Sequence, residues 1–179
     1  LAEEAWLFGA DVTLIRGPGN DTEYRDIRTI GVETAAEMRD AVIAESRGAS
    51  ALMMAAAVED ICPREKYHKK ITKDQIPDSL SLSRTPDILQ TLAEQNIPPM
   101  RIGFSAQTDD NLTTARQKLK RKKLAWIMVN NIAKKDVGFA ADTNQVTMLD
   151  ARGREISLPV LSKRDTARKI IETLWRDNL

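Results

Sequence analysis

Apolar and polar residues alternate in short blocks along the first two thirds of the chain, in the order strand then helix. Short apolar or β-branched runs predict strands at residues 11–15, 29–32, 51–56, 101–106 and 126–130. Helices are expected from Thr34 to about Arg47, from Thr85 onward with Pro86 in the first turn, and over residues 110–123 and 163–175.

This order predicts an α/β fold, a three-layer Rossmann-like arrangement in which a mostly parallel sheet carries helices on both faces. Residues 51–56 show no alternation, which is typical of a parallel strand covered on both sides. Residues 145–150 and 155–158 flank a short turn and predict an antiparallel hairpin near the C-terminus. Residues 1–9 indicate the second half of a helix that ends at Gly9, so we expect a segment upstream of Leu1.

Residues 61–79 have no convincing period, are polar and charged, and contain two prolines. They predict a long ordered or flexible loop, and loops of that length usually have a function. The next residues, 79–83, alternate with period two and predict a half-exposed strand.

Composition favours a single globular domain covering residues 1–179, because 42% of the residues are apolar. The formal charge of +1 provides no global field for nucleic acid or a membrane surface, and no apolar run approaches the roughly 20 residues of a membrane-spanning helix. The single cysteine, Cys62, cannot form an internal disulfide, which favours a cytoplasmic protein.

Several common chemistries have no motif in the chain. There is no Gly-x-Gly-x-x-Gly fingerprint for NAD and no Gly-Lys-Ser/Thr phosphate loop. His68 stands without the cysteine, histidine or carboxylate pattern of a metal site, so no metal ligand is assigned. Cys62 has no second histidine and no capped helix N-terminus beside it in the sequence that would activate it as a nucleophile.

Two strand ends carry candidate binding residues, because parallel sheets build their sites at the carboxyl ends of the strands. After residues 51–56, Ala57 would let a flat base approach the backbone, and Asp60 would accept hydrogen bonds; alternatively the alanines pack under a helix. Toward the end of the predicted strand 101–106, Phe104 follows Gly103 and is either a stacking platform or part of the core.

Two clusters of basic residues suggest an anionic ligand. Lys118 and Lys122 are four apart on one helix face, where like charges repel unless a phosphate-rich ligand offsets them, although a solvated face explains a charge run equally well. Lys66 and Lys69 belong to the loop at 61–79, which would close over a triphosphate or simply add solubility. Nucleic acid is not favoured, because no aromatic residue lies within the basic run.

Taken in order, these segments resemble the phosphopantothenoylcysteine synthetase family of coenzyme A biosynthesis, and the resemblance covers essentially the whole chain. The matching segments are Gly9 to Ile15 with Gly17-Pro18, Thr34-Ala35, Glu37-Met38, Ala56 to Asp60, Lys69-Lys70, Pro86 to Leu89, Gly103 to Thr108, Ala115 to Lys122, Val129 to Asn131, and Phe139 to Val146.

The resemblance implies a ligase with three substrates, 4′-phosphopantothenate, cysteine and CTP with Mg²⁺, in which an acyl-cytidylate forms first and cysteine then displaces CMP. It places Ala57, Asp60 and Phe104 in the nucleotide site and gives Lys118 and Lys122 the task of selecting the pyrimidine or holding phosphate. Asn130 is a further candidate at a strand end. The resemblance leaves open whether CTP or ATP is used.

The resemblance also implies a homodimer, because Arg84 stands where the family usually has a lysine that reaches the active site of a second subunit. Two features depart from the family pattern. Tyr67 occupies the position of the first lysine of the lysine loop, so Lys66 or Lys69 would take the catalytic role. The family's first strand and phosphate loop are expected before Leu1. FMN is expected as a cofactor only if a decarboxylase domain precedes the chain.

Two alternatives to the ligase remain at this point. One is a catalytically impaired nucleotide-binding or regulatory domain derived from the same family, which Tyr67 favours. The other is an NAD(P)-binding oxidoreductase on the same α/β plan, for which the chain has no fingerprint.

Overall fold

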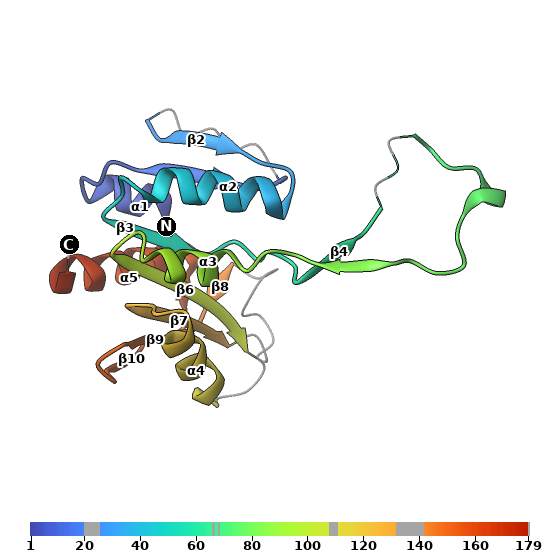
Figure 1. Cartoon of the computed structure of the whole chain (residues 1–179). Coiled ribbons are helices and arrows are strands. Elements are labelled where there is room, and N and C mark those ends of the chain that lie inside the picture. The colour runs from blue at the N-terminus through green and yellow to red at the C-terminus, as the bar shows by residue number, and fades with distance from the viewer. Residues whose placement is uncertain (20–25, 66, 68, 108–110, 132–141, 179) are drawn as a thin grey trace.

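Figure 1 shows the computed structural model of the chain, which describes residues 1–19, 26–65, 67, 69–107, 111–131 and 142–178. Its main sheet has five strands in the order β10-β9-β7-β6-β3. The strands β3 (Ala51–Met54), β6 (Met100–Gln107) and β7 (Trp126–Asn131) are parallel. The strand β9 (Val146–Asp150) continues the sheet antiparallel to β7, and β10 (Glu155–Ser157) pairs antiparallel to β9. The predicted α/β fold and its C-terminal hairpin are therefore confirmed.

Helices cover both faces of this sheet and give it three layers (Figure 1). The helices are α1 (Ala2–Leu7), α2 (Ala35–Ser46), α3 (Ile88–Gln95), α4 (Thr113–Arg121) and α5 (Lys163–Asn178). On one face, Trp126 and Met128 of β7 pack with Ile170 and Leu174 of α5. On the other face, the alternate β7 residues Ile127 and Val129 pack with α4. The pleat of β7 thus assigns even-numbered positions to α5 and odd-numbered positions to α4.

The helix ends follow the chemistry that the sequence predicts, with one exception. Thr34 and Glu37 form both halves of a capping box at the start of α2. Gly9 ends α1 with φ +89°, and the paired bonds that follow α1 form a Schellman motif. Pro86 does not lie in the first turn of α3 as predicted, because Asp87 is the N-cap and Pro86 precedes it.

Two N-terminal strands, β1 (Thr13–Arg16) and β2 (Arg28–Gly31), form a separate parallel pair. The strand β3 lies at one edge of the five described strands, and each of its residues is only half-buried. Both faces of β3 nonetheless pack against core residues, because Leu52 and Met54 contact the cluster of α2 and α3, and Ala51 and Met53 contact the cluster on the α5 side. The prediction of a strand covered on both faces is therefore confirmed, and the edge position explains the partial exposure of each residue.

The predicted loop at 61–79 is part of an arm, which we define as residues 61–84 without positions 66 and 68. Its base is a short antiparallel pair of β4 (Ile61–Pro63) and β5 (Leu82–Arg84), and a 3₁₀ turn, η1 (Lys73–Gln75), lies between them. The arm extends away from the body in Figure 1. A second short pair, β8 (Thr143–Asn144) with β11 (Leu161–Ser162), leads into α5.

Candidate functional site

A cavity of about 520 Å³ lies at the carboxyl ends of β3, β6 and β7. This is the edge at which open α/β sheets bind ligands, and the volume is in the range of small-molecule sites. The cavity brings together six residues proposed from the sequence, namely Ala57, Asp60, Phe104, Lys118, Lys122 and Asn130.

The α4 side of the cavity carries two lysines of the basic helix segment, Lys118 and Lys122. The Lys118 ammonium donates to the Ser105 hydroxyl at 3.3 Å, and the Lys122 ammonium pairs with the Asp87 carboxylate at 2.9 Å. The Lys122 side chain is only 17% exposed, whereas the Asp87 side chain is 46% exposed, so the pair lies at the rim with its lysine side shielded from water. The charge that offsets the two lysines in the structure is thus Asp87, together with the carbonyl end of the α4 dipole, since both lysines lie at the C-terminal end of α4.

Asp87 serves two structural tasks at the rim of the cavity. Its Oδ1 caps α3 by accepting from the Gln90 amide at 3.1 Å, and the same oxygen accepts from Lys122. Desolvation raises the pKa of the Asp87 carboxyl, but the hydrogen bonds from Lys122 and Gln90 lower that pKa by more. Asp87 is therefore held ionised, and it positions Lys122 at the cavity wall.

The α5 side of the cavity is formed by an aromatic ring, two asparagines and one lysine. Phe104 of β6 and Asn130 of β7 share this face, because the register pairs Phe104 with Met128 and Ala106 with Asn130. The Asn130 Nδ2 donates to the Oδ1 of Asn144 in β8 at 3.5 Å. Lys163, the first residue of α5, also lines the cavity.

Asp60 lies where the body meets the arm. The Thr85 amide donates to the Asp60 carbonyl oxygen at 3.0 Å, and the Thr85 hydroxyl donates to the Glu59 carbonyl oxygen. These bonds join the segment after β3 to the start of α3. They hold the exposed Asp60 side chain at the rim of the cavity, where the sequence places a polar ligand contact.

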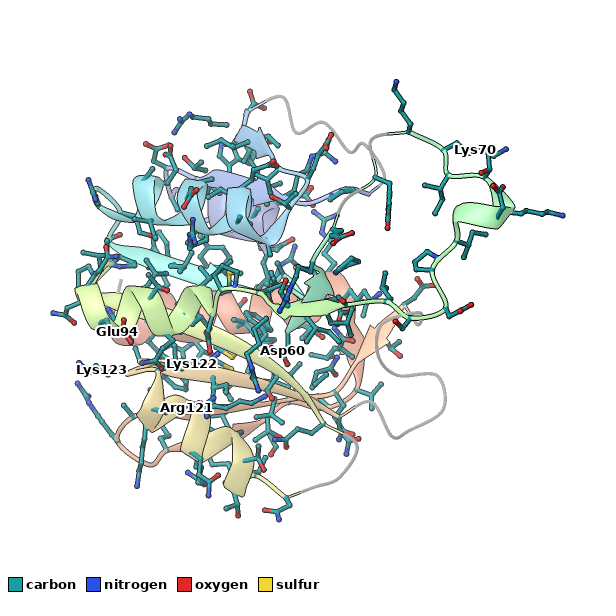
Figure 2. The ribbon with its side chains drawn as sticks, turned by 45° about the vertical axis from the view of Figure 1, so that its right-hand side comes forward. Asp60, Lys70, Glu94, Arg121, Lys122 and Lys123 are labelled. Atoms are coloured by element: carbon teal, nitrogen blue, oxygen red, sulfur yellow. The ribbon has the colours of Figure 1, made fainter. Side chains whose placement is uncertain are left out.

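The remaining candidates lie on the arm or outside the described residues. Lys69 and Arg84 are exposed and do not line the cavity, and Lys66 lies outside the described residues. In Figure 2, Lys70 lies on the far part of the arm, away from Asp60 and Lys122 on the body. Tyr67, at the position expected for a lysine, is 53% exposed. Within this chain the lysines of the arm therefore do not join the cavity.

Sequence analysis assigned no site role to several residues that line the cavity, including Ser105, Asp87, Asn144 and Lys163. Ser105, Asp87 and Asn144 lie inside segments that match the family pattern, and the predicted helix start beside Asp87 was a further signal for that residue. The positions of Asn144 and Lys163 at the cavity were not predictable locally, because the β8–β11 pairing and the start of α5 bring them there from a distant part of the chain.

In residues 1–19, 26–65, 67, 69–107, 111–131 and 142–178, no group of three or more histidine, cysteine or acidic side chains is placed to hold a metal ion. Over the same residues, none of the helices has the length and apolar character that crossing a membrane requires.

Comparison with known proteins identifies close relatives. The family described as "DNA/pantothenate metabolism flavoprotein C-terminal domain" matches residues 1–176. The "Coenzyme A biosynthesis bifunctional protein CoaBC" of Bacillus subtilis (strain 168) is 36% identical over 175 residues, covering 97% of this chain and 43% of that protein. A "Cysteine/Cysteine sulfinic acid decarboxylase" from an unknown prokaryotic organism is 34% identical over 176 residues, covering 97% of this chain and 49% of that protein. The chain thus spans less than half of these two relatives.

The fold comparison agrees with the sequence comparison. The crystal structure of the C-terminal domain of a CoaBC protein superimposes with a TM-score of 0.79 at 32% identity. That match covers 97% of this chain and 77% of the other.

Proposed function

The chain belongs to the family of the DNA/pantothenate metabolism flavoprotein C-terminal domain, and on this premise we propose that it is a phosphopantothenate–cysteine ligase domain of coenzyme A biosynthesis. The finer proposal is that MgCTP activates 4′-phosphopantothenate as an acyl-cytidylate. The observation that carries it is one cavity at the strand ends, where two lysines, an aromatic ring and small residues from distant segments come together.

The residues of the cavity suit the first step of such a reaction. A carboxylate oxygen of 4′-phosphopantothenate bonds to the α-phosphorus of CTP, and the bond from that phosphorus to the pyrophosphate oxygen breaks. Both reactants are anions, so fixed positive charge lowers the barrier. Lys118 and Lys122 supply this charge from the α4 wall, where Ser105 and Asp87 hold them in place.

In the second step, the amine nitrogen of cysteine bonds to the acyl carbon, CMP leaves, and the amine loses a proton. The small side chain of Ala57 leaves room for the nucleotide beside the backbone, and Asp60 accepts hydrogen bonds from its hydroxyls or amino group. Phe104 lies at the base or ribose.

The arm fits a role between two copies of the chain. It carries Lys69 and Arg84, which do not line the cavity of their own chain. We propose that the arm of one protomer brings these cations to the cavity of a partner in a homodimer, with Lys66 or Lys69 as the catalytic lysine.

The alternatives differ in their support. An impaired nucleotide-binding or regulatory domain remains a second candidate, because Tyr67 stands at the lysine position and is exposed on the arm. The NAD(P)-binding oxidoreductase alternative is wrong, because the family match over residues 1–176 assigns the chain to a different family.

The first prediction tests the lysines of α4. Lys118→Gln and Lys122→Gln should each weaken binding of MgCTP by about 10-fold to 100-fold, because each removes a charge-assisted contact to phosphate. Isothermal titration calorimetry measures the dissociation constants. Lys120→Gln is the matched control, since Lys120 lies in the same helix, is exposed and does not line the cavity.

The outcomes separate the candidates. Equal losses for all three variants would mean that the cavity lysines act only through general charge. An unmutated protein that binds MgCTP but forms no phosphopantothenoylcysteine would favour the impaired domain. A protein that binds no nucleoside triphosphate would refute the proposed activity.

A further inference from the structure

Lys163 lines the cavity from the first position of α5, on the face of the sheet opposite to α4. We call the part of the cavity that Lys163 forms with Asn130 and Asn144 the α5 wall. The Ser162 hydroxyl accepts from the Asp165 amide at 3.0 Å and donates to the Asp165 carboxylate at 2.7 Å, so Ser162 itself caps the helix. The exposed ammonium of Lys163 is therefore the positive charge that the α5 wall offers to a ligand.

The α5 wall also contains an amide oxygen without a hydrogen-bond donor. The Asn130 Oδ1 is buried, and no described residue donates to it. Leaving a buried acceptor unpaired is costly, and such groups usually have a partner in the functional state of a protein. Because Asn130 lines the cavity, a ligand that carries an N–H or O–H group is the natural source of that donor.

Asn144 connects the amide oxygen and the lysine. Its Oδ1 accepts from the Asn130 Nδ2 at 3.5 Å, which turns the Asn130 Oδ1 away from Asn144. The same bond makes the Nδ2 of Asn144, a donor, the outer end of its own amide. Asn144 pairs with Leu161, and Lys163 follows two residues later. The α5 wall thus presents one acceptor, from Asn130, and two donors, from Asn144 and Lys163.

An acceptor combined with a cation is the pattern that recognises an α-amino acid. The amino group of such a ligand requires an acceptor, and its carboxylate requires donors with positive charge. A fully ionised phosphate would suit Lys163 but would place a second acceptor opposite the Asn130 Oδ1. The α4 side of the cavity differs, because it offers two ammonium groups and suits phosphate better.

We propose that the α5 wall is the amino-acid subsite of the ligase, where Lys163 binds the carboxylate of cysteine and the Asn130 Oδ1 accepts from its amine. This inference rests on the proposed function. In that reaction the amine nitrogen bonds to the acyl carbon, the bond from this carbon to the phosphate oxygen breaks, and CMP leaves with the electron pair. The nitrogen loses a proton to water, and Asn130 stays neutral and orients the amine.

Two substrates that differ in one group test the contact of Lys163. Cysteine and cysteamine share the amine and the thiol, but only cysteine has a carboxylate. The unmutated protein should use cysteine with a kcat/KM about tenfold or more above that for cysteamine, because the charge-assisted contact is made only by cysteine. Lys163→Gln should lower kcat/KM for cysteine by about tenfold and leave the value for cysteamine unchanged. Chromatography of the amide products measures both rates.

The first half of the reaction separates this subsite from the nucleotide site. A burst of pyrophosphate from MgCTP and 4′-phosphopantothenate, measured without cysteine, reports formation of the acyl-cytidylate. Lys163→Gln should leave the burst unchanged, whereas Lys118→Gln should reduce it. A reduced burst in Lys163→Gln would assign Lys163 to the nucleotide or the acyl substrate and would overturn the inference.

Asn130→Leu gives a second and distinct signature. Leucine has a similar volume and no acceptor, so the variant should lower kcat/KM for cysteine and cysteamine alike and leave the pyrophosphate burst unchanged. Lys169→Gln is the matched control for Lys163→Gln, because Lys169 is exposed on α5 and does not line the cavity. It should change neither substrate ratio nor burst.

The remaining outcomes distinguish the inference from the proposed function. If Lys163→Gln affects cysteine and cysteamine equally, or affects neither, Lys163 does not bind the carboxylate and the inference is wrong, while the ligase proposal stands. If the unmutated protein yields neither pyrophosphate nor an amide product, the proposed function fails, and the amino-acid subsite fails with it.

Discussion

At the scale of single residues, the buried Arg101 side chain connects the ends of the two helices, α3 and α4, that flank the cavity. Arg101 is 3% exposed in β6 and donates to the Pro98 carbonyl at 2.7 Å, the Lys123 carbonyl at 3.0 Å and the Asn96 Oδ1 at 3.4 Å. Asn96 and Lys123 have left-handed backbone at the ends of α3 and α4. Burial lowers the pKa of the guanidinium. One side chain thus ties together the ends of the two helices that flank the cavity.

Replacing this guanidinium tests its structural role. Arg101→Lys should lower the free energy of unfolding by about 1 to 3 kcal/mol, because an ammonium cannot reproduce the planar fork that meets three acceptors. Urea denaturation followed by circular dichroism measures the loss. Arg121→Lys is the matched control, since Arg121 is exposed on α4, and it should change the stability little. Equal stability of the two variants would contradict the role of Arg101.

The residue scale also shows what sequence reasoning can reach at the site. Lys118 and Lys122 were predictable as a pair because a helix places residues four apart on one face. Their partners, Ser105 and Asp87, were not, because a contact between α4 and the start of α3 depends on how the helices pack on β6. Gly103 shows the same dependence: a Cβ there would lie 2.8 Å from a Leu124 methyl, a close approach that no local motif indicates.

At the scale of elements, an ionic cluster around a buried carboxylate attaches α1 to α5. Glu4 of α1 is 2% exposed and accepts from the Arg164 Nε at 3.0 Å and the Arg168 Nε at 3.1 Å. Desolvation raises the pKa of the Glu4 carboxyl, but Arg168 and Arg164 lower it by more, so it lies below its ordinary value. Because Leu1 lines the cavity, this cluster also determines where the start of α1 lies relative to the site.

The lowered pKa predicts a dependence of stability on pH. A carboxyl of this kind contributes stability above its pKa in the unfolded chain, and the contribution is lost as pH falls through its folded pKa. Glu4→Gln should therefore cost about 2 kcal/mol at pH 7, since the two arginine partners remain largely solvated and soften the loss. The difference between the variant and the unmutated protein should shrink in acid. Chemical denaturation at pH 7 and at pH 3 to 4 measures both values, and a difference independent of pH would contradict the assignment.

Elements with local chemistry were predictable, and elements formed by distant pairing were not. The capping box at Thr34 and the glycine after α1 depend only on residues close together in the sequence, so both helix ends were predicted. The pairing of β4 with β5 was not, because it joins two three-residue strands across a long segment without a periodic pattern. The pairing of β8 with β11, which brings Asn144 and Lys163 to the cavity, escaped prediction for the same reason.

At the scale of the whole molecule, the arm is the feature that the single chain does not explain. Five large apolar side chains on it are about half exposed: Ile61, Tyr67, Ile76, Leu80 and Leu82. A two-stranded arm has no core in which to bury them, and exposed apolar side chains in a group indicate a partner surface. A second copy of the chain is the partner that the proposed function requires.

Complementation between inactive variants tests whether the arm serves a partner's cavity. If the site combines Lys118 of one protomer with Arg84 of the other, the homodimers of Lys118→Gln and of Arg84→Ala should each lose most of their ligase activity. A mixed dimer of the two variants then contains one site with both changes and one site with neither. Random exchange of subunits in an equal mixture should restore about a quarter of the activity, because half of the dimers are mixed and each has one intact site.

The same experiment carries its own controls. A mixture of Lys118→Gln with Lys122→Gln should recover no activity, because α4 supplies both lysines to the same cavity and neither site of a mixed dimer is intact. Size-exclusion chromatography with light scattering reports whether the variants still form dimers. Recovery in the first mixture and none in the second would assign Arg84 to the partner's site. No recovery in either mixture of stable dimers would place Arg84 and Lys118 in the same protomer's site, and the arm would then have to fold back over its own cavity.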